Sequence, residues 1–142
     1  MGVFNAISEQ PRGGLYTCAV SLSPTREDLA QALKIPYDPS KTTISTLVLA
    51  GTKNDVITPE GMEILYGKLG GPKVMALRDG TDHGQRRYSG DGYVTAWFLY
   101  WLQGDEEAGK AFFGEPGELS QNFLWQNVRM DRETQTELCS DA

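Results

Sequence analysis

The sequence predicts an α/β protein built on a parallel sheet. Three short apolar runs are continuous rather than alternating, which is typical of parallel strands covered on both faces; they are residues 15–22, 46–50 and 73–77. Helical patterns separate and follow these runs. Because strands that alternate with helices form βαβ units, we expect about three parallel strands flanked by helices.

The two clearest helices are predicted from apolar spacing and from their ends. Residues 59–69 have apolar side chains at helical spacing, with Thr58 as N-cap and Pro59 at the first position. Residues 92–103 carry one wide apolar stripe, formed by Tyr93, Ala96, Trp97, Tyr100 and Trp101. A stripe of this width packs against a core, so we interpret it as structural rather than as a cofactor site.

Shorter helices are expected at residues 3–9, at residues 26–34 and just after Gly104. The segment that follows, up to residue 130, reads as irregular and anchored by Phe112, Phe113 and Trp125. We therefore expect one domain over residues 1–130 and a polar, flexible tail over residues 131–142.

Composition excludes several classes of function. The chain has 142 residues and a net charge of -6, with its basic residues scattered, which argues against nucleic acid or an anionic membrane as the main partner. Two cysteines and one histidine do not make a disulfide framework or a metal site. No apolar run approaches the roughly 20 residues that span a bilayer. No phosphate-binding loop follows a strand, so we expect no cofactor.

The N-terminal residues do not assign a compartment. They lack the basic start and the apolar core of a signal peptide. A chain complete at Met1 would be cytoplasmic, and a chain preceded by an N-terminal half could be secreted.

Two loops carry residues suited to catalysis. Asp55 follows the second predicted strand, and His83 follows the third. The carboxyl ends of parallel strands meet at one edge of a sheet, where active sites of α/β proteins form. A carboxylate beside a histidine fixes the imidazole tautomer and stabilises the imidazolium. Gly80 and Gly84 would let the histidine loop turn tightly.

Other polar residues are weaker candidates. Asp82 could compete as the acid, but adjacent residues rarely aim a carboxylate at the imidazole, so we prefer Asp55. Three serines could be imagined as nucleophiles, namely Ser21, Ser23 and Ser89. None lies in the Gly-x-Ser-x-Gly elbow that exposes a serine on a strained turn. A turn-forming Asp and a solvated His remain the alternative reading of the pair.

The segments TLVLAGTKNDVITPEG, VMALRDGTDHG, YVTAWFLYWLQGDEEA and KAFFGE follow one another along the chain. In this order they resemble the C-terminal half of α/β-hydrolases, most closely the dienelactone-hydrolase, chlorophyllase and polyester-hydrolase-like esterases. The resemblance implies a hydrolase of small-molecule or polymeric esters. It places Gly51, Asp55 and Pro59 in the family's G-x-x-x-D-x-x-x-P setting, with Asp55 as catalytic acid and His83 as catalytic histidine.

The same resemblance places the nucleophile outside the chain. In the family the elbow serine runs directly into a helix, and MGVFNAISE is similar to the opening of that helix. The serine and the oxyanion donors would then lie upstream of Met1, so we expect a C-terminal portion of a serine esterase that is inactive alone. Two alternatives stay open: a non-catalytic α/β binding module with remnant triad residues, and, less favoured, a receiver-type domain.

A missing N-terminal half would also leave a sheet edge open. The strand at residues 15–22 would normally pair with the elbow strand. An apolar edge without its neighbour invites pairing with another chain. We therefore expect self-association, or a requirement for the N-terminal half, through this strand.

Overall fold

The fold is centred on one four-stranded mixed sheet. The computed structural model describes residues 2–9, 14–53 and 55–133. In this part of the chain the strands are β1 (Cys18–Leu22), β2 (Ser45–Gly51), β3 (Lys73–Arg78) and β4 (Trp125–Asp131), and they lie in the order β1-β2-β3-β4. The first three are parallel, and β4 is antiparallel to β3. The expected α/β class and its three parallel strands are confirmed.

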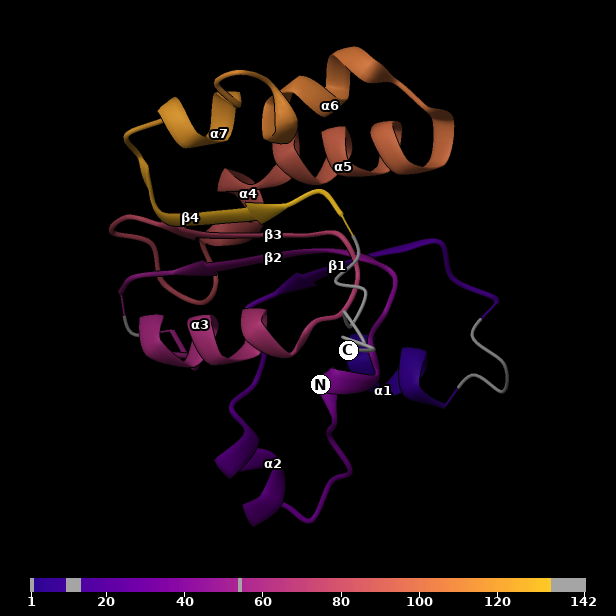
Figure 1. The fold of residues 1–142 in the computed structure, drawn as a ribbon. Helices are drawn as coiled ribbons and strands as arrows, with labels where there is room; N and C mark the ends of the chain where they lie inside the picture. Colours follow the sequence, from indigo (N-terminus) through magenta and orange to yellow (C-terminus); the bar gives the residue numbers. More distant parts are fainter. Residues whose placement is uncertain (1, 10–13, 54, 134–142) are drawn as a thin grey trace, which may run out of the picture.

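Helices cover both faces of the sheet (Figure 1). On one face lie α5 (Asp91–Gln103), α6 (Glu106–Phe113) and α7 (Glu118–Gln121). On the other lie α1 (Gly2–Ser8) and α3 (Pro59–Lys68), with α2 (Glu27–Ala32) beyond them. The short elements α4 (Arg86–Ser89) and η1 (Pro39–Lys41) complete the described helices. The sheet is therefore the middle layer of three.

The two central strands divide their side chains between two cores. Leu47 and Leu49 of β2 pack with Trp97 and Phe112 on the α5 side. Val48 and Ala50 of the same strand pack on the α1 and α3 side. Because successive side chains of a strand point to opposite faces, both halves of an unbroken apolar run are buried. This explains the continuous apolar pattern of the sequence.

The predicted start of α3 is observed, and the helix ends at Lys68, one residue before the predicted end. The Thr58 hydroxyl accepts a hydrogen bond from the Gly61 N–H at 3.1 Å, and Pro59 is the first residue of the helix. At the other end the buried Lys73 donates through Nζ to the carbonyls of Tyr66 and Leu69, at 2.9 Å each. These carbonyls belong to the last turn of the helix, where they lack intrahelical partners. Lys73 thereby joins the end of α3 to the start of β3.

The predicted strand at residues 15–22 is too long. Strand β1 begins at Cys18, whose partner in β2 is Ser45, the first residue of that strand. Leu15 and Tyr16 therefore precede the paired region and are 69% and 42% exposed. The helix expected at residues 26–34 is also shorter, because α2 ends at Ala32.

Strand β4 was missed by the sequence prediction, which treated this segment as irregular. Its inward side chains are Trp125, Val128 and Met130, so the first spacing is three residues rather than two. Asn127 has φ 50°, and the pairing of β3 with β4 shifts register nearby. An extra residue of this kind is a β-bulge, which breaks the alternation by which a strand is recognised.

Strand β4 includes the first residue of the expected tail. The expected tail begins at residue 131, which is still the last residue of β4. Most of that tail, residues 134–142, lies outside the described residues.

Among the helices of the described segments, each is too short or too polar to cross a lipid bilayer.

Replacement of Trp97 tests how much the core on the α5 side contributes to the stability of the fold. Its side chain is fully buried and contacts the Phe112 ring edge-on at 5.1 Å between ring centroids. We expect Trp97→Ala to lower the free energy of unfolding by about 3–5 kcal/mol in urea titrations. The neighbouring Phe98 is 38% exposed, so Phe98→Ala should cost less. Equal losses for both variants would contradict this packing.

Candidate active site

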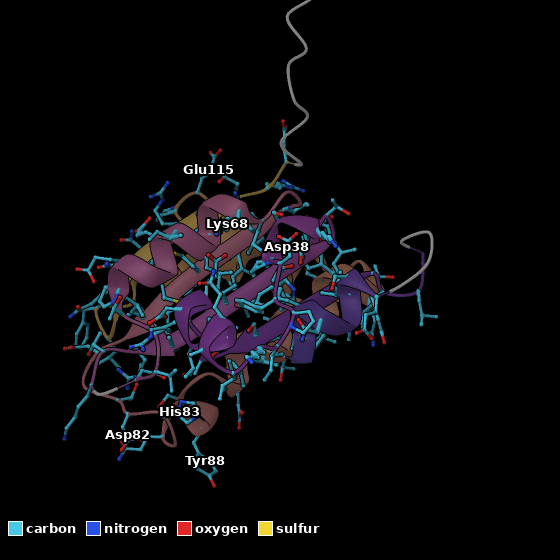
Figure 2. The ribbon with its side chains drawn as sticks, turned by 90° about the horizontal axis from the view of Figure 1, so that it is seen from below. Asp38, Lys68, Asp82, His83, Tyr88 and Glu115 are labelled. Atoms are coloured by element: carbon cyan, nitrogen blue, oxygen red, sulfur yellow. The ribbon has the colours of Figure 1, made fainter. Side chains whose placement is uncertain are left out.

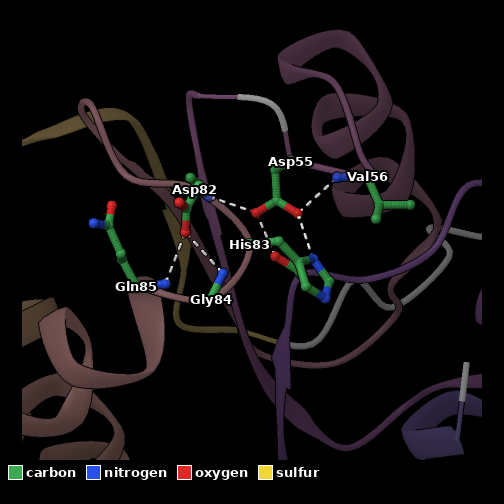
Figure 3. Close-up of polar contacts among 8 residues, drawn as sticks. Asp55, Val56, Asp82, His83, Gly84 and Gln85 are labelled. Atoms are coloured by element: carbon green, nitrogen blue, oxygen red, sulfur yellow. Dashed lines mark hydrogen bonds and ion pairs between the residues drawn. The ribbon is translucent and has the colours of Figure 1, made fainter.

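Asp55 and His83 meet at the edge of the sheet where the parallel strands end. Asp55 lies in the loop after β2, and His83 lies in the loop after β3. The Nδ1 atom of His83 is 3.0 Å from Oδ1 of Asp55 (Figure 3). The predicted contact between the two side chains is confirmed, and we refer to the pair as the dyad.

The Asp55 carboxylate is held through both of its oxygens. Oδ1 accepts a hydrogen bond from the Val56 N–H at 2.7 Å and faces His83. Oδ2 accepts one from the Gly51 N–H at 2.9 Å and one from the Ser23 hydroxyl. Donors from three loops therefore fix the plane of the carboxylate.

Burial and hydrogen bonding act in opposite directions on this acid. The Asp55 side chain is 0% exposed, although its backbone is partly open to solvent. Burial raises the pKa of the carboxyl, whereas the hydrogen bonds from Ser23, Gly51, His83 and Val56 lower it. The hydrogen bonds prevail, so the pKa of Asp55 lies below its ordinary value. The group is a charged carboxylate at neutral pH.

A charged carboxylate determines which histidine nitrogen carries the proton. An ionised carboxylate can only accept hydrogen bonds, so Nδ1 of His83 must donate in this contact. In the neutral ring the other nitrogen, Nε2, is then the basic one. The His83 side chain is 55% exposed, which gives a reactant access to the ring. The geometry thus supplies an oriented base.

Hydrogen bonds between the two loops hold the dyad together. The Lys53 N–H donates to the Thr81 carbonyl at 3.0 Å, and the Gly80 N–H donates to the Thr52 hydroxyl at 2.8 Å. Gly80 has φ 68°, a conformation that favours glycine, as expected for a tight turn. A Cβ atom at Gly51 would lie 2.1 Å from the Thr81 carbonyl oxygen. The close approach therefore depends on glycine at position 51.

Asp82 has a different role from Asp55. Its carboxylate accepts hydrogen bonds from the N–H groups of Gly84 and Gln85, at 2.9 and 3.0 Å (Figure 3). It shapes the loop that leads into α4, as a turn-forming Asp does. Asp82, His83 and Tyr88 lie together at one end of the molecule (Figure 2). The preference for Asp55 as the partner of His83 agrees with this arrangement.

Each of the three candidate serines either donates its hydroxyl to another group or is buried. Ser23 donates its hydroxyl proton to Asp55, and Ser89 donates to the Gln85 carbonyl at 3.4 Å. Ser21 is buried in β1. Sequence reasoning weighed Ser23 only as a nucleophile and missed its contact with Asp55. The available signal was its place directly after a strand that neighbours β2.

The described residues offer little for a metal. In the segments 2–9, 14–53 and 55–133, no three His, Cys, Asp or Glu side chains are grouped so that they could hold an ion. Comparison of the chain with models of known protein families finds no match, and comparison with curated proteins finds none either.

Gly51 gives a direct test of how the loops are held. Gly51→Ala would force Cβ against the Thr81 carbonyl, and we expect a loss of about 1–3 kcal/mol in the free energy of unfolding. The ring proton resonances of His83, the single histidine of the chain, should shift as the loop moves.

Gly67→Ala is the matched control, because a Cβ at this helical glycine meets no atom within 4 Å. It should raise stability by roughly 0.5–1 kcal/mol and leave the His83 resonances in place. An unchanged spectrum in Gly51→Ala would contradict the proposed packing of the two loops.

Proposed function

We propose that this chain supplies the acid and the base of a Ser-His-Asp centre in a carboxylic ester hydrolase. The observation that carries the proposal is the contact between Asp55 Oδ1 and His83 Nδ1 at 3.0 Å, with the acid buried and the imidazole exposed. In such centres the carboxylate orients the imidazole and stabilises its charged form. The likeness of the loops to those of dienelactone-hydrolase-type esterases supports the same class.

The proposed reaction uses His83 twice. Nε2 takes the proton of a serine hydroxyl while the serine oxygen attacks the ester carbonyl. The tetrahedral intermediate collapses, the imidazolium gives that proton to the leaving alkoxide, and an acyl-serine remains. Water then attacks the acyl group, with His83 as base and then as acid, and releases the carboxylic acid. Asp55 stays ionised throughout.

The serine and the oxyanion donors would come from a segment other than the described residues. We place that segment beside β1, which in the described sheet pairs with β2 alone. A groove of about 270 Å³ runs along this edge, and its walls include Val3, Ile7, Val20 and Phe98. An added parallel strand would cover the groove and would end next to the loops of the dyad.

This arrangement has consequences for the chain alone. A base without a nucleophile or an oxyanion hole can accept a proton but gives no route to an acyl-enzyme. We therefore expect negligible ester hydrolysis by these residues on their own. The open edge of β1 would instead favour pairing with the segment that carries the nucleophile, or with a second copy of the chain.

The function can be tested by supplying a segment that carries a serine nucleophile and oxyanion donors. The chain is fused behind the N-terminal half of a dienelactone-hydrolase-like esterase, and hydrolysis of p-nitrophenyl butyrate is followed. We expect turnover, with kcat falling by about 10⁴-fold in Asp55→Asn and by at least that in His83→Ala. Asp82→Asn is the matched control, because an amide oxygen can still accept from Gly84 and Gln85. It should leave kcat almost unchanged.

Two results would count against this function. A fusion in which His83→Ala hydrolyses the ester as fast as the unmodified protein would exclude His83 as the base. A folded fusion that shows no turnover, and whose serine does not react with a fluorophosphonate, would favour a non-catalytic binding module.

A further inference from the structure

Ser23 stands at the end of a row of three side chains. It directly follows β1, while Asp55 follows β2 and His83 follows β3. Its hydroxyl donates to Asp55 Oδ2, the oxygen opposite to the one that faces His83. The ends of three neighbouring parallel strands thus contribute serine, aspartate and histidine in that order, with the acid in the middle.

Ser23 differs from the backbone donors to the same carboxylate. Val56 belongs to the loop of Asp55 itself, and Gly51 is the last residue of β2, the strand that leads into this loop. Ser23 is 32 residues away and belongs to another strand. Its hydrogen bond therefore links the carboxylate to the end of β1, which the two backbone donors do not do.

The backbone of Ser23 is held in an uncommon conformation. Its φ is 47°, a left-handed value that residues other than glycine adopt only uncommonly. Its N–H donates to the Leu49 carbonyl of β2 at 2.7 Å. A strained residue that is fixed to the neighbouring strand and aims a side chain into a site indicates a functional constraint.

We propose that Ser23 is a positioning residue for the dyad. Its hydroxyl holds the Asp55 carboxylate in the plane in which Oδ1 faces Nδ1 of His83. It acts through Asp55 and does not touch the reacting atoms. The catalytic meaning of this role rests on the proposed hydrolase function, whereas the contact itself does not.

The charge of Asp55 supports the same role. Among the hydrogen bonds that lower the pKa of this buried carboxyl, the one from Ser23 has the largest effect. A hydroxyl that donates to a carboxylate stabilises its ionised form. Loss of the hydroxyl should therefore raise the pKa of Asp55, because burial is then less well offset.

Variants of the full chain test the proposal without any nucleophile. Glycine accepts a left-handed φ and lacks the hydroxyl, so Ser23→Gly separates the hydrogen bond from the backbone strain. Ser23→Ala lacks the hydroxyl and keeps the strain. The matched control is Ser40→Ala, because Ser40 also donates its hydroxyl to a carboxylate, that of Asp38 at 2.5 Å. The Ser40 hydrogen bond also lowers the pKa of its partner.

The measurement is the pH titration of the carboxyl carbons by ¹³C NMR. We expect both Ser23 variants to raise the pKa of Asp55 and to leave Asp38 unchanged, and Ser40→Ala to do the reverse. The proposal is overturned if Asp55 titrates as in the unmodified chain in both Ser23 variants. It is also overturned if only Ser23→Ala changes the titration, since the backbone would then hold the acid.

The two proposals can fail separately. The titration needs no ester and no elbow serine, so it can succeed while the fusion shows no hydrolysis. Conversely, an active fusion together with an unchanged Asp55 titration would retain the hydrolase function and remove Ser23 from it.

Discussion

The buried carboxylate of Asp55 is the interaction on which the site depends. It accepts hydrogen bonds from a residue after β1, from the end of β2 and from the loop after β3. A buried charge is costly unless hydrogen bonds satisfy it, so these loops are constrained to stay together. The parallel register of the three strands supplies the donors, and the close approach at Gly51 brings the histidine loop within reach. The strand arrangement thus stabilises the buried charge of Asp55, and this charge in turn keeps the loops together.

Much of the fold could be predicted because local signals agreed with tertiary packing. The unbroken apolar runs in β2 and β3 required cover on both faces, and Thr58 with Pro59 marked the start of α3. The errors occurred where a partner strand decides the outcome. Residues 15–17 were predicted as strand, but they precede Cys18, which already pairs with the first residue of β2, so they have no partner in that strand. The bulge at Asn127 interrupts the alternation by which β4 could have been recognised.

The two candidate catalytic residues could be predicted from the sequence better than the contacts that hold them in place. Asp55 and His83 could be placed side by side, because parallel strands bring their carboxyl ends to one edge. The place of Ser23 after β1 could put it near this edge, but its contact with Asp55 could not be assigned, since that contact spans 32 residues and involves a left-handed backbone. Asp82 could be distinguished from Asp55 as the partner of His83 only by the direction of its carboxylate, which its own loop determines. Catalytic use of the dyad remains a proposal that the geometry supports.

The most direct measurement is the tautomer of the His83 imidazole in the chain as it stands. Because His83 is the single histidine, one long-range ¹H–¹⁵N correlation spectrum reports it without assignment by mutation. At a pH where the ring is neutral, we expect a proton on Nδ1 and an unprotonated Nε2, and loss of that preference in Asp55→Asn. A neutral ring protonated mainly on Nε2 would contradict the proposed role of His83 as the base, because the nitrogen that should accept the serine proton would already carry one.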